Sequence, residues 1–262
     1  MSGRGSRDHR ERAQALYKAR ATRTPIAPLT DDDPSLGLAD GYAIQRELVA
    51  MLADDGERIV GYKAGLTSEP MRRQFGVDTP DYGPVFASTL YRDGGRVPRE
   101  DFIAPKVEAE IVFRLGSRLA GPGVTVEAAR AAVADVMAGL EVVDSRIEDW
   151  RIRLADTVAD LASNGAVVLG GRAVPLRGVD PRLIGMVFSR NGELVATGAG
   201  AAAFGDPVEV VAWLANTLGA HGVALEPGHL IMTGALHAAV TVEHGDTFTA
   251  EFDHLGSVTF QA

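Results

Sequence analysis

The stretch VEAEIVFRL, residues 107–115, alternates in polarity along its length. In an extended strand, one face would carry the apolar side chains of Val107, Ala109, Ile111 and Phe113. Glu108 and Glu110 would then share the opposite face. Because two carboxylates on one strand face repel each other, they are either solvated or share a cation. The stretch predicts a β-strand that carries either a wet face or part of a metal site.

A third carboxylate, Glu141, lies in the apolar run of residues 138–143, where residues 140–143 predict a second strand. An isolated charge in such a strand is expensive to bury. Three carboxylates without a nearby histidine or cysteine are the oxygen donors that Mg²⁺ or Mn²⁺ prefers. Spacing alone leaves both interpretations of Glu108 and Glu110 open, whereas Glu141 is harder to explain as a solvated residue.

The length and composition of the chain limit the classes of function that it can have. The chain has 262 residues, of which 46% are hydrophobic, and its net charge is -9. It is long enough for one large β-rich domain with a short helical preface. The acidic balance disfavours a general nucleic-acid binder. No stretch approaches the roughly 18 apolar residues of a membrane span, so we expect no membrane insertion and a cytoplasmic location.

Several kinds of chemistry are excluded by the residue inventory. The chain contains no cysteine, which removes disulfides, thiolate catalysis and Cys-ligated metal sites. No histidine occurs between Arg10 and Ala220, so the region of the carboxylates cannot assemble a His-centred triad. The fold could bring His237 into a functional site, or His237 could be a strand histidine whose ring nitrogens are satisfied by hydrogen bonds. No glycine-rich dinucleotide fingerprint is present between a predicted strand and helix.

Two helical segments are predicted near the N-terminus. Apolar residues recur at helical spacing in residues 12–20 and 43–53, and the intervening residues 24–38 have the Pro and Asp content of a loop. Residues 58–66 predict a strand that runs into a glycine-flanked turn. Residues 68–70, Ser-Glu-Pro, form a helix-start signature.

The remainder predicts a β-rich body with a few packed helices. Helices are expected at 125–137, with Thr125 as N-cap, and at 156–162, before an apolar run at 166–169. Residues 144–150, DSRIEDW, are typical of an amphipathic turn or helix end. Asn191-Gly192 is a strong hairpin signal. The clearest helix has Asp206 as N-cap, Pro207 at its first position and Gly219 as its stop.

Six motifs, in order, resemble a known family: GYKAGLTS (61–68), TPDYGPVF (79–86), PKVEAEIVF (105–113), LEVVDSRIEDW (140–150), DTVADLAS (156–163) and TGAL (233–236). They are similar to the 2-keto-4-pentenoate hydratase and 4-oxalocrotonate decarboxylase family, within the fumarylacetoacetate hydrolase superfold. The resemblance covers roughly residues 40–262. It implies an α+β fold, namely a mixed β-roll with packed helices. We expect an N-terminal helical part at 1–57 and a catalytic domain at 58–262.

The resemblance also implies the site. Its metal ligands match Glu108, Glu110 and Glu141, which would bind Mg²⁺ or Mn²⁺. Its catalytic residues match Lys63 and Asp81, and its substrate-binding residues match Leu66 and Ser163. On its own, Lys63 between Gly61 and Gly65 could equally be a surface lysine at a strand end. One departure is visible, because Leu161 stands in ADLAS where family members usually have Asn.

The implied activity is hydration of a 2-hydroxy-2,4-dienoate to a 4-hydroxy-2-oxo acid in the meta-cleavage breakdown of aromatic compounds. The cation would stabilise the enolate, and Lys63 and Asp81 would bind the carboxylate or move protons. The alternatives are decarboxylation of 2-oxohex-3-enedioate and, from another class, a non-catalytic metal-bound partner subunit. We expect a homo-oligomer that could associate with a paralogous decarboxylase or hydratase. Neither nucleic acid nor membrane is an expected partner.

Overall fold

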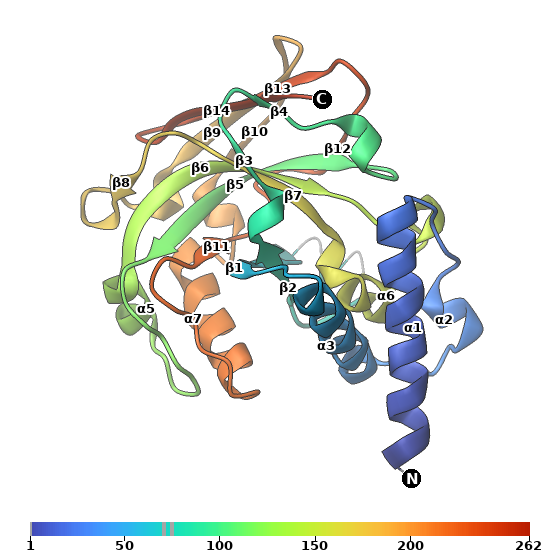
Figure 1. Cartoon of the computed structure of the whole chain (residues 1–262). Helices are drawn as coiled ribbons and strands as arrows, with labels where there is room; N and C mark the ends of the chain where they lie inside the picture. The colour runs from blue at the N-terminus through green and yellow to red at the C-terminus, as the bar shows by residue number, and fades with distance from the viewer. Residues whose placement is uncertain (1, 70–71, 74–75) are drawn as a thin grey trace.

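The computed structural model describes residues 2–69, 72–73 and 76–262, with side chains described from residue 7 onward. Figure 1 shows a larger and a smaller β-sheet with helices packed on the outside of the larger one. Helices α1, α3 and α6 lie on one side of the molecule, and α5 and α7 lie on the other. The predicted α+β class is confirmed.

The larger sheet is mixed. Its strand order is β2 (Asp81–Phe86), β1 (Ile59–Gly65), β11 (Leu230–Met232), β5 (Lys106–Leu115), β6 (Val133–Val143), β7 (Asn164–Leu169) and β3 (Leu90–Arg92). Two short strands, β12 (Val240–Thr241) and β8 (Val174–Pro175), pair with β5 and β6. The β1–β11 and β3–β7 pairs are parallel, and the other pairs of this sheet are antiparallel.

The smaller sheet packs above the larger one (Figure 1). Its strand order is β10 (Glu193–Ala199), β9 (Gly185–Arg190), β13 (Thr247–Phe252), β14 (Gly256–Gln261) and β4 (Gly95–Arg96). Asn191 and Gly192 join β9 to β10 with φ angles of 53° and 82°. Positive φ at both central residues is what the hairpin turn requires, so the hairpin prediction is confirmed.

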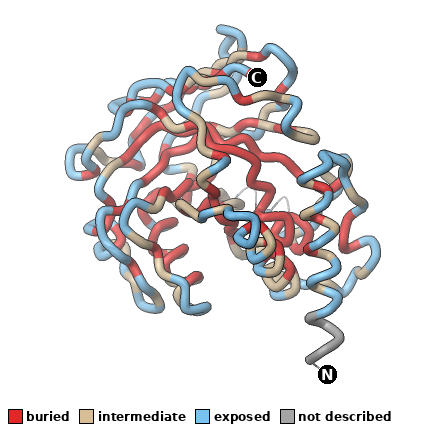
Figure 2. Tube along the Cα trace, in the orientation of Figure 1, coloured by how far each residue is buried: buried red, intermediate tan, exposed pale blue. Residues whose placement is uncertain are grey.

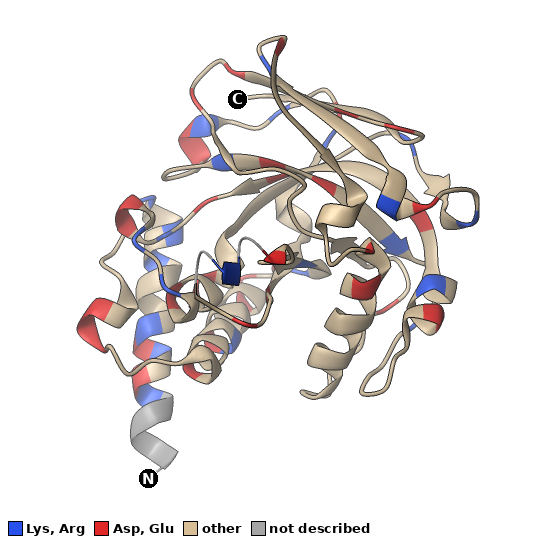
Figure 3. Cartoon of the chain, turned by 180° about the vertical axis from the view of Figure 1, so that it is seen from behind, with Lys and Arg blue, Asp and Glu red and all other residues tan. Residues whose placement is uncertain are grey.

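The described helices are α1 (Ser2–Thr22), α2 (Leu29–Asp32), α3 (Leu38–Asp54), α5 (Val126–Ala132), α6 (Leu154–Ala159) and α7 (Pro207–Gly219). Asp206 caps α7 by accepting a hydrogen bond from the Val208 backbone N–H, as predicted. None of these helices is long and apolar enough to cross a membrane. Acidic and basic residues are interspersed along α1 (Figure 3).

Short 3₁₀ turns join several of these elements: Ala87–Thr89, Arg99–Asp101, Glu148–Trp150, Leu161–Ser163, Leu176–Gly178, Pro181–Leu183 and Gly200–Ala202. The turn Leu161–Ser163 connects α6 to β7. The turn Glu148–Trp150 occupies the segment predicted as an amphipathic turn or helix end.

Three expected segments differ from the structure, and a fourth runs outside the described residues. The helix expected at 125–137 ends at Ala132, because Val133 to Met137 already pair with β5 and the β-branched valines favour a strand. The expected loop at 24–38 contains the single helical turn α2. The helix expected at 156–162 is α6, which begins at Leu154 and ends at Ala159. The helix start expected at 68–70 runs into residues outside the described part of the chain.

The core has a main part between the two sheets and a second part among the helices. The main cluster includes Ile111, Phe113, Phe248 and Phe260, each 0% exposed. The second cluster joins α1 and α3 to the larger sheet through Leu16, Ile44, Leu48, Phe86 and Leu161. Figure 2 shows the buried strands running through the middle of the molecule. The strands that carry the glutamates are therefore buried on both faces.

Candidate active site

Strand register gathers the three glutamates. In the antiparallel β5–β6 pair, Glu108 lies opposite Glu141 and Glu110 lies opposite Gly139. Residues that alternate along β5 and oppose one another across the pair share one face, so their carboxylates converge. One oxygen of each carboxylate lies within 4.8 Å of the others. Glu110 and Glu141 are 1% and 0% exposed, which rules out a wet face at these positions.

The electrostatics of this carboxylate cluster are unfavourable without a cation. Burial and the neighbouring charge of Glu141 raise the pKa of Glu108 to about 7. Burial, followed by repulsion from Glu141 and Glu108, raises the pKa of Glu110 well above its usual value. The buried Oε2 of Glu141 has no hydrogen-bond partner among the described residues. Three converging carboxylates with an orphaned oxygen fit a hard divalent cation such as Mg²⁺ or Mn²⁺.

Lys63 brings a positive charge to the edge of the cluster. It lies on β1, is 5% exposed, and donates from Nζ to the carbonyl oxygen of Ala162 at 2.8 Å. Its Nζ also lies 3.4 Å from Oε1 of Glu141. Burial alone would lower the pKa of Lys63, but attraction to Glu141, Asp81 and the other glutamates outweighs burial and raises it. Lys63 is therefore an internal ammonium and not a surface lysine.

Asp81 begins β2 beside the end of β1. In the antiparallel β1–β2 pair, Asp81 lies opposite Gly65 and Gly83 lies opposite Lys63. Because Lys63 and Gly65 are two residues apart on β1, the side chains of Lys63 and Asp81 lie on the same face of the sheet. Asp81 is 3% exposed, its pKa is raised by burial, and its Oδ1 has no partner among the described residues. A Cβ on Gly65 would lie 2.2 Å from this Oδ1. Glycine is thus needed at residue 65 for the carboxylate to occupy this place.

The two residues matched as substrate-binding lie in different surroundings. Leu66 has a left-handed backbone with φ of 56° and lines a small cavity of about 40 Å³ together with Lys63, Glu108 and Glu110. Ser163 is 5% exposed, and its hydroxyl lies 3.1 Å from Oγ1 of Thr157. The described lining of this cavity does not include Ser163.

A larger cavity adjoins the small one. Its volume is about 840 Å³, and it shares Thr67, Ser68 and Ala235 with the small cavity. Its described walls combine apolar groups, among them Phe204 and Leu236, with the charged residues Arg72, Glu69 and Glu209. Two of the three glutamates, Glu108 and Glu110, therefore line a small cavity that adjoins a space large enough for an organic acid.

His237 lines the larger cavity but is held by the fold. Its Nε2 accepts a hydrogen bond from the Ala109 backbone N–H at 2.9 Å, and its Nδ1 donates to the Ala238 carbonyl at 2.7 Å. Its ring stacks on Phe188 with the centroids 4.3 Å apart. Both ring nitrogens are used, so His237 is a satisfied histidine, but it lies in the bend between β11 and β12 and not in a strand as that interpretation expected.

Leu161, the departure from ADNAS, points into the helical part of the core. It is 0% exposed and packs in the cluster that contains Ile44, Leu48 and Phe86. Leu161 is also absent from the described lining of the small cavity that Glu108 and Glu110 share. The residue that supplies an amide to the site is instead Asn164, whose Nδ2 donates to Oε1 of Glu141 at 3.0 Å. Sequence reasoning missed Asn164 because nothing in the pattern separates it from other residues at a strand start.

Addition of Mg²⁺ or Mn²⁺ should stabilise the protein against heat. A cation that binds only the folded state relieves the repulsion among the buried glutamates and adds about 2.7 kcal/mol at about 100 times its dissociation constant. Differential scanning calorimetry of chelator-treated protein, with and without the metal, measures the shift in Tm. KCl at matched ionic strength is the control. A shift no larger than that produced by KCl would contradict a metal site at these glutamates.

Comparison with known proteins agrees with this geometry. The model of the family described as fumarylacetoacetate (FAA) hydrolase C-terminal matches residues 62–261. A 2-keto-4-pentenoate hydratase of Paraburkholderia xenovorans is 45% identical over 95% of this chain and 92% of its own. A 4-oxalocrotonate decarboxylase of Pseudomonas putida is 41% identical over 94% of each chain.

A solved structure is similar over almost the whole length. The 4-oxalocrotonate decarboxylase from Pseudomonas putida G7, complexed with magnesium and adipate, superimposes with a TM-score of 0.94. It is 39% identical, and the match covers 97% of both chains. Matches of this extent, together with the family model, leave one assignment. The chain belongs to the fumarylacetoacetate hydrolase family.

Proposed function

We propose that this protein is a divalent-metal-dependent hydratase. It would add water to a 2-hydroxy-2,4-dienoate, in its 2-oxopent-4-enoate form, to give a 4-hydroxy-2-oxo acid. The observation that carries the proposal is the convergence of Glu108, Glu110 and Glu141 beside an internal ammonium, with Lys63, Glu108 and Glu110 lining a cavity. The hydratase named among the relatives, at 45% identity, supports this activity over others in the family.

The three glutamates would hold Mg²⁺ or Mn²⁺. When bound, a divalent cation supplies Lewis-acid stabilisation of negative charge on the oxygens of a 2-oxo acid. The remaining roles belong to the side chains around the glutamates. The apolar walls of the larger cavity would exclude water from the hydrocarbon part of the acid, and its volume of about 840 Å³ accommodates a substrate of this class.

Lys63 would orient the substrate carboxylate. An ammonium has three donor hydrogens, and the structure gives Lys63 one hydrogen bond, to the Ala162 carbonyl, and an ion pair with Glu141 Oε1 at 3.4 Å. A donor hydrogen would therefore remain for an anionic ligand. Asp81, with an unpartnered Oδ1 on the same face, would move the proton between substrate carbon and water. Leu66 would contact the substrate from the cavity wall. Ser163 would bind the substrate from the turn whose Ala162 carbonyl accepts the hydrogen bond from Lys63.

Decarboxylation of 2-oxohex-3-enedioate is the second candidate. The structure that superimposes with a TM-score of 0.94 is a 4-oxalocrotonate decarboxylase complexed with magnesium and adipate, which is a six-carbon diacid. The same carboxylate cluster would serve either reaction, because both stabilise charge on a 2-oxo acid. A non-catalytic partner subunit is disfavoured by the presence of Lys63, Asp81 and all three glutamates.

A paired assay separates these candidates. The purified protein, with and without Mg²⁺, is given 2-hydroxypenta-2,4-dienoate, followed by ultraviolet absorbance, and 2-oxohex-3-enedioate, followed by CO₂ release. We expect metal-dependent formation of 4-hydroxy-2-oxopentanoate without CO₂ release. Dominant CO₂ release would establish the decarboxylase instead. Metal binding without turnover of either acid would favour the partner subunit.

We also propose that the chain forms a homo-oligomer. The strand β10 lies at the edge of the smaller sheet, and Leu194 and Val195 on it are 66% and 43% exposed. Val187 of β9 and Leu183 are exposed nearby in the chain. An unpaired edge that carries exposed apolar residues is suited to association. Association with a paralogous hydratase or decarboxylase would use the same kind of surface, and light scattering of the protein alone measures the homo-oligomer.

A further inference from the structure

The turn between α6 and β7 has an unusual backbone. Leu161, Ala162 and Ser163 are consecutive and all left-handed, with φ of 59°, 51° and 57°. Non-glycine residues disfavour this conformation because Cβ crowds the following carbonyl oxygen. Such a turn persists only where the surrounding structure holds it, and strained backbone of this kind clusters at functional sites.

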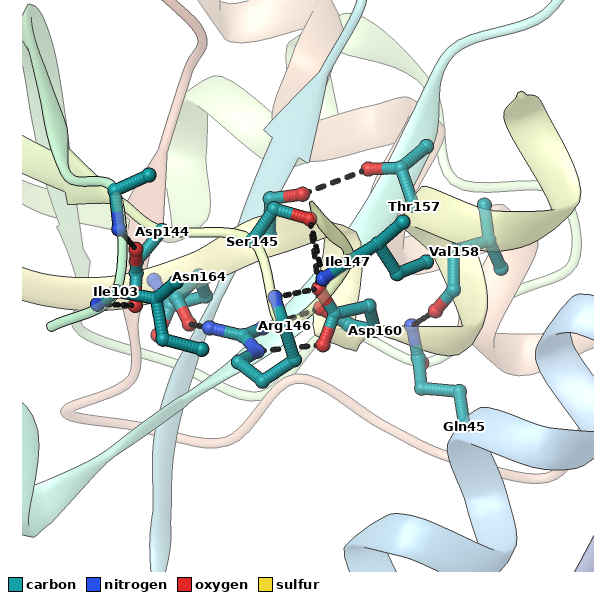
Figure 4. Close-up of polar contacts among 12 residues, drawn as sticks. Gln45, Ile103, Asp144, Ser145, Arg146, Ile147, Thr157, Val158, Asp160 and Asn164 are labelled. Carbon is teal, nitrogen blue, oxygen red and sulfur yellow. Dashed lines mark hydrogen bonds and ion pairs between the residues drawn. The ribbon is translucent and has the colours of Figure 1, made fainter. Parts of the chain in front are cut away.

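A buried ion pair holds this turn at both ends. Nε of Arg146 donates to Oδ1 of Asp160 at 2.5 Å, and the Arg146 backbone N–H donates to Oδ2 at 2.9 Å. The guanidinium also donates from Nη2 to the Asp160 carbonyl at 2.6 Å and from Nη1 to the Asn164 carbonyl at 3.0 Å. The two side chains are 3% and 0% exposed. Figure 4 shows Arg146 reaching between Asp160 and Asn164, on either side of the turn.

The same turn supplies contacts to the carboxylate cluster. The carbonyl of Ala162 accepts the hydrogen bond from Lys63 Nζ at 2.8 Å. Asn164, directly after the turn, donates to Glu141 Oε1 at 3.0 Å. Arg146 therefore fixes the backbone carbonyls of the two residues that flank the turn, while the turn and Asn164 contact Lys63 and Glu141.

We propose that Arg146, paired with Asp160, is a positioning residue for the proposed reaction. It holds the left-handed turn so that the side chains of Lys63 and Glu141 keep their positions relative to each other. Arg146 and Asp160 are absent from the described linings of both cavities at the site, so they act through the turn and not on substrate. The expected changes in kcat and KM rest on the proposed function. The expected change in the reactivity of Lys63 does not.

The geometry requires arginine specifically. A planar guanidinium can donate to the Asp160 side chain and to two carbonyls at once, whereas a lysine ammonium on a flexible chain cannot span the same three acceptors. Positive charge alone would be kept by Arg146→Lys, so this variant separates charge from geometry. Asp160→Asn removes the charge of the partner and replaces one acceptor oxygen with a donor that faces the Arg146 backbone N–H.

The test compares Arg146→Lys with Arg151→Lys, a matched substitution at an exposed arginine that pairs with Asp31 and Glu148. We expect Arg146→Lys to lower kcat about 10- to 100-fold and to weaken Mn²⁺ binding about tenfold, as loss of a residue that orients metal ligands does. KM should stay within about threefold of wild type, because substrate contacts remain. Arg151→Lys should match wild type in all three measurements.

A second readout is independent of substrate. The rate of acylation of Lys63 in the metal-free protein, followed by mass spectrometry of its peptide, should rise several-fold in Arg146→Lys and not in Arg151→Lys. Where Arg146→Lys does not fold by circular dichroism, the near-isosteric Asp160→Asn replaces it in the same measurements. A folded variant of either kind with wild-type kcat, Mn²⁺ affinity and Lys63 reactivity would overturn the inference. If wild type turns over neither acid, the proposed function fails, and Lys63 acylation still decides this proposal.

Discussion

Replacing Lys63 with methionine should lower kcat by about 10²- to 10⁴-fold, the usual contribution of a positioned acid-base or charge-stabilising group. The variant removes the ammonium 3.4 Å from Glu141 Oε1 and the donor to the Ala162 carbonyl. Binding of the divalent metal should survive and be as tight as in wild type or tighter, because a positive charge beside the glutamates repels the cation. Steady-state kinetics and calorimetric titration with Mn²⁺ measure the two effects separately.

The matched control for this variant is Lys18→Met, at an exposed position on α1. It should leave kcat and Mn²⁺ affinity unchanged. Metal-free Lys63→Met should also be less stable than wild type by about 3–5 kcal/mol, since removal of one partner leaves a buried charge uncompensated. Retention of more than about a tenth of the wild-type kcat would remove Lys63 from the mechanism.

Glu141→Gln should abolish tight metal binding. Glu141 faces Glu108 across the β5–β6 pair, is 0% exposed, and holds the orphaned Oε2 of the cluster. Glutamine keeps the shape of the side chain but removes the negative charge, and we expect the dissociation constant for Mn²⁺ to rise at least about 10²-fold. The metal-induced rise in Tm should disappear with it, and kcat/KM at fixed metal should fall in parallel.

Glu100→Gln is the matched control, since Glu100 is exposed and pairs with Arg96 at 2.9 Å. It should bind Mn²⁺ as wild type does. The decisive measurement is the Mn²⁺ dissociation constant by isothermal titration, made before any assay of activity. A Glu141→Gln protein that binds Mn²⁺ with wild-type affinity would show that the cluster is not the metal site, whatever its activity.

Local patterns predicted much of the secondary structure. The alternation at 107–115 became β5, the Asp206-Pro207 start became α7, and Asn191-Gly192 became the β9–β10 turn. Each depends on interactions within a few residues: side-chain period, a capping oxygen, or the freedom to adopt positive φ. Where a boundary was wrong, as at Ala132, pairing with a distant strand outweighed the local helical signal.

The candidate site was predictable in part. Periodicity alone placed Glu108 and Glu110 on one face, and Glu141 stood out as a charge in an apolar strand. The matches of Lys63, Asp81, Leu66 and Ser163 came from resemblance to family motifs, and their roles remain proposals. The residues that hold the site together, Arg146, Asp160 and Asn164, escaped notice, because their side chains resemble ordinary charged and polar groups in a turn.

By itself, the sequence determined which segments are extended, which helices are capped, and which residue types are available for chemistry. Those properties follow from the period of a strand, from turn geometry and from the inventory of side chains. Only the tertiary structure decided that Glu108 faces Glu141, that Lys63 is internal, and that the turn Leu161–Ser163 is left-handed. The register of two strands, the burial of a charge and the support of a strained turn all depend on contacts between residues far apart in the chain, which local patterns do not encode.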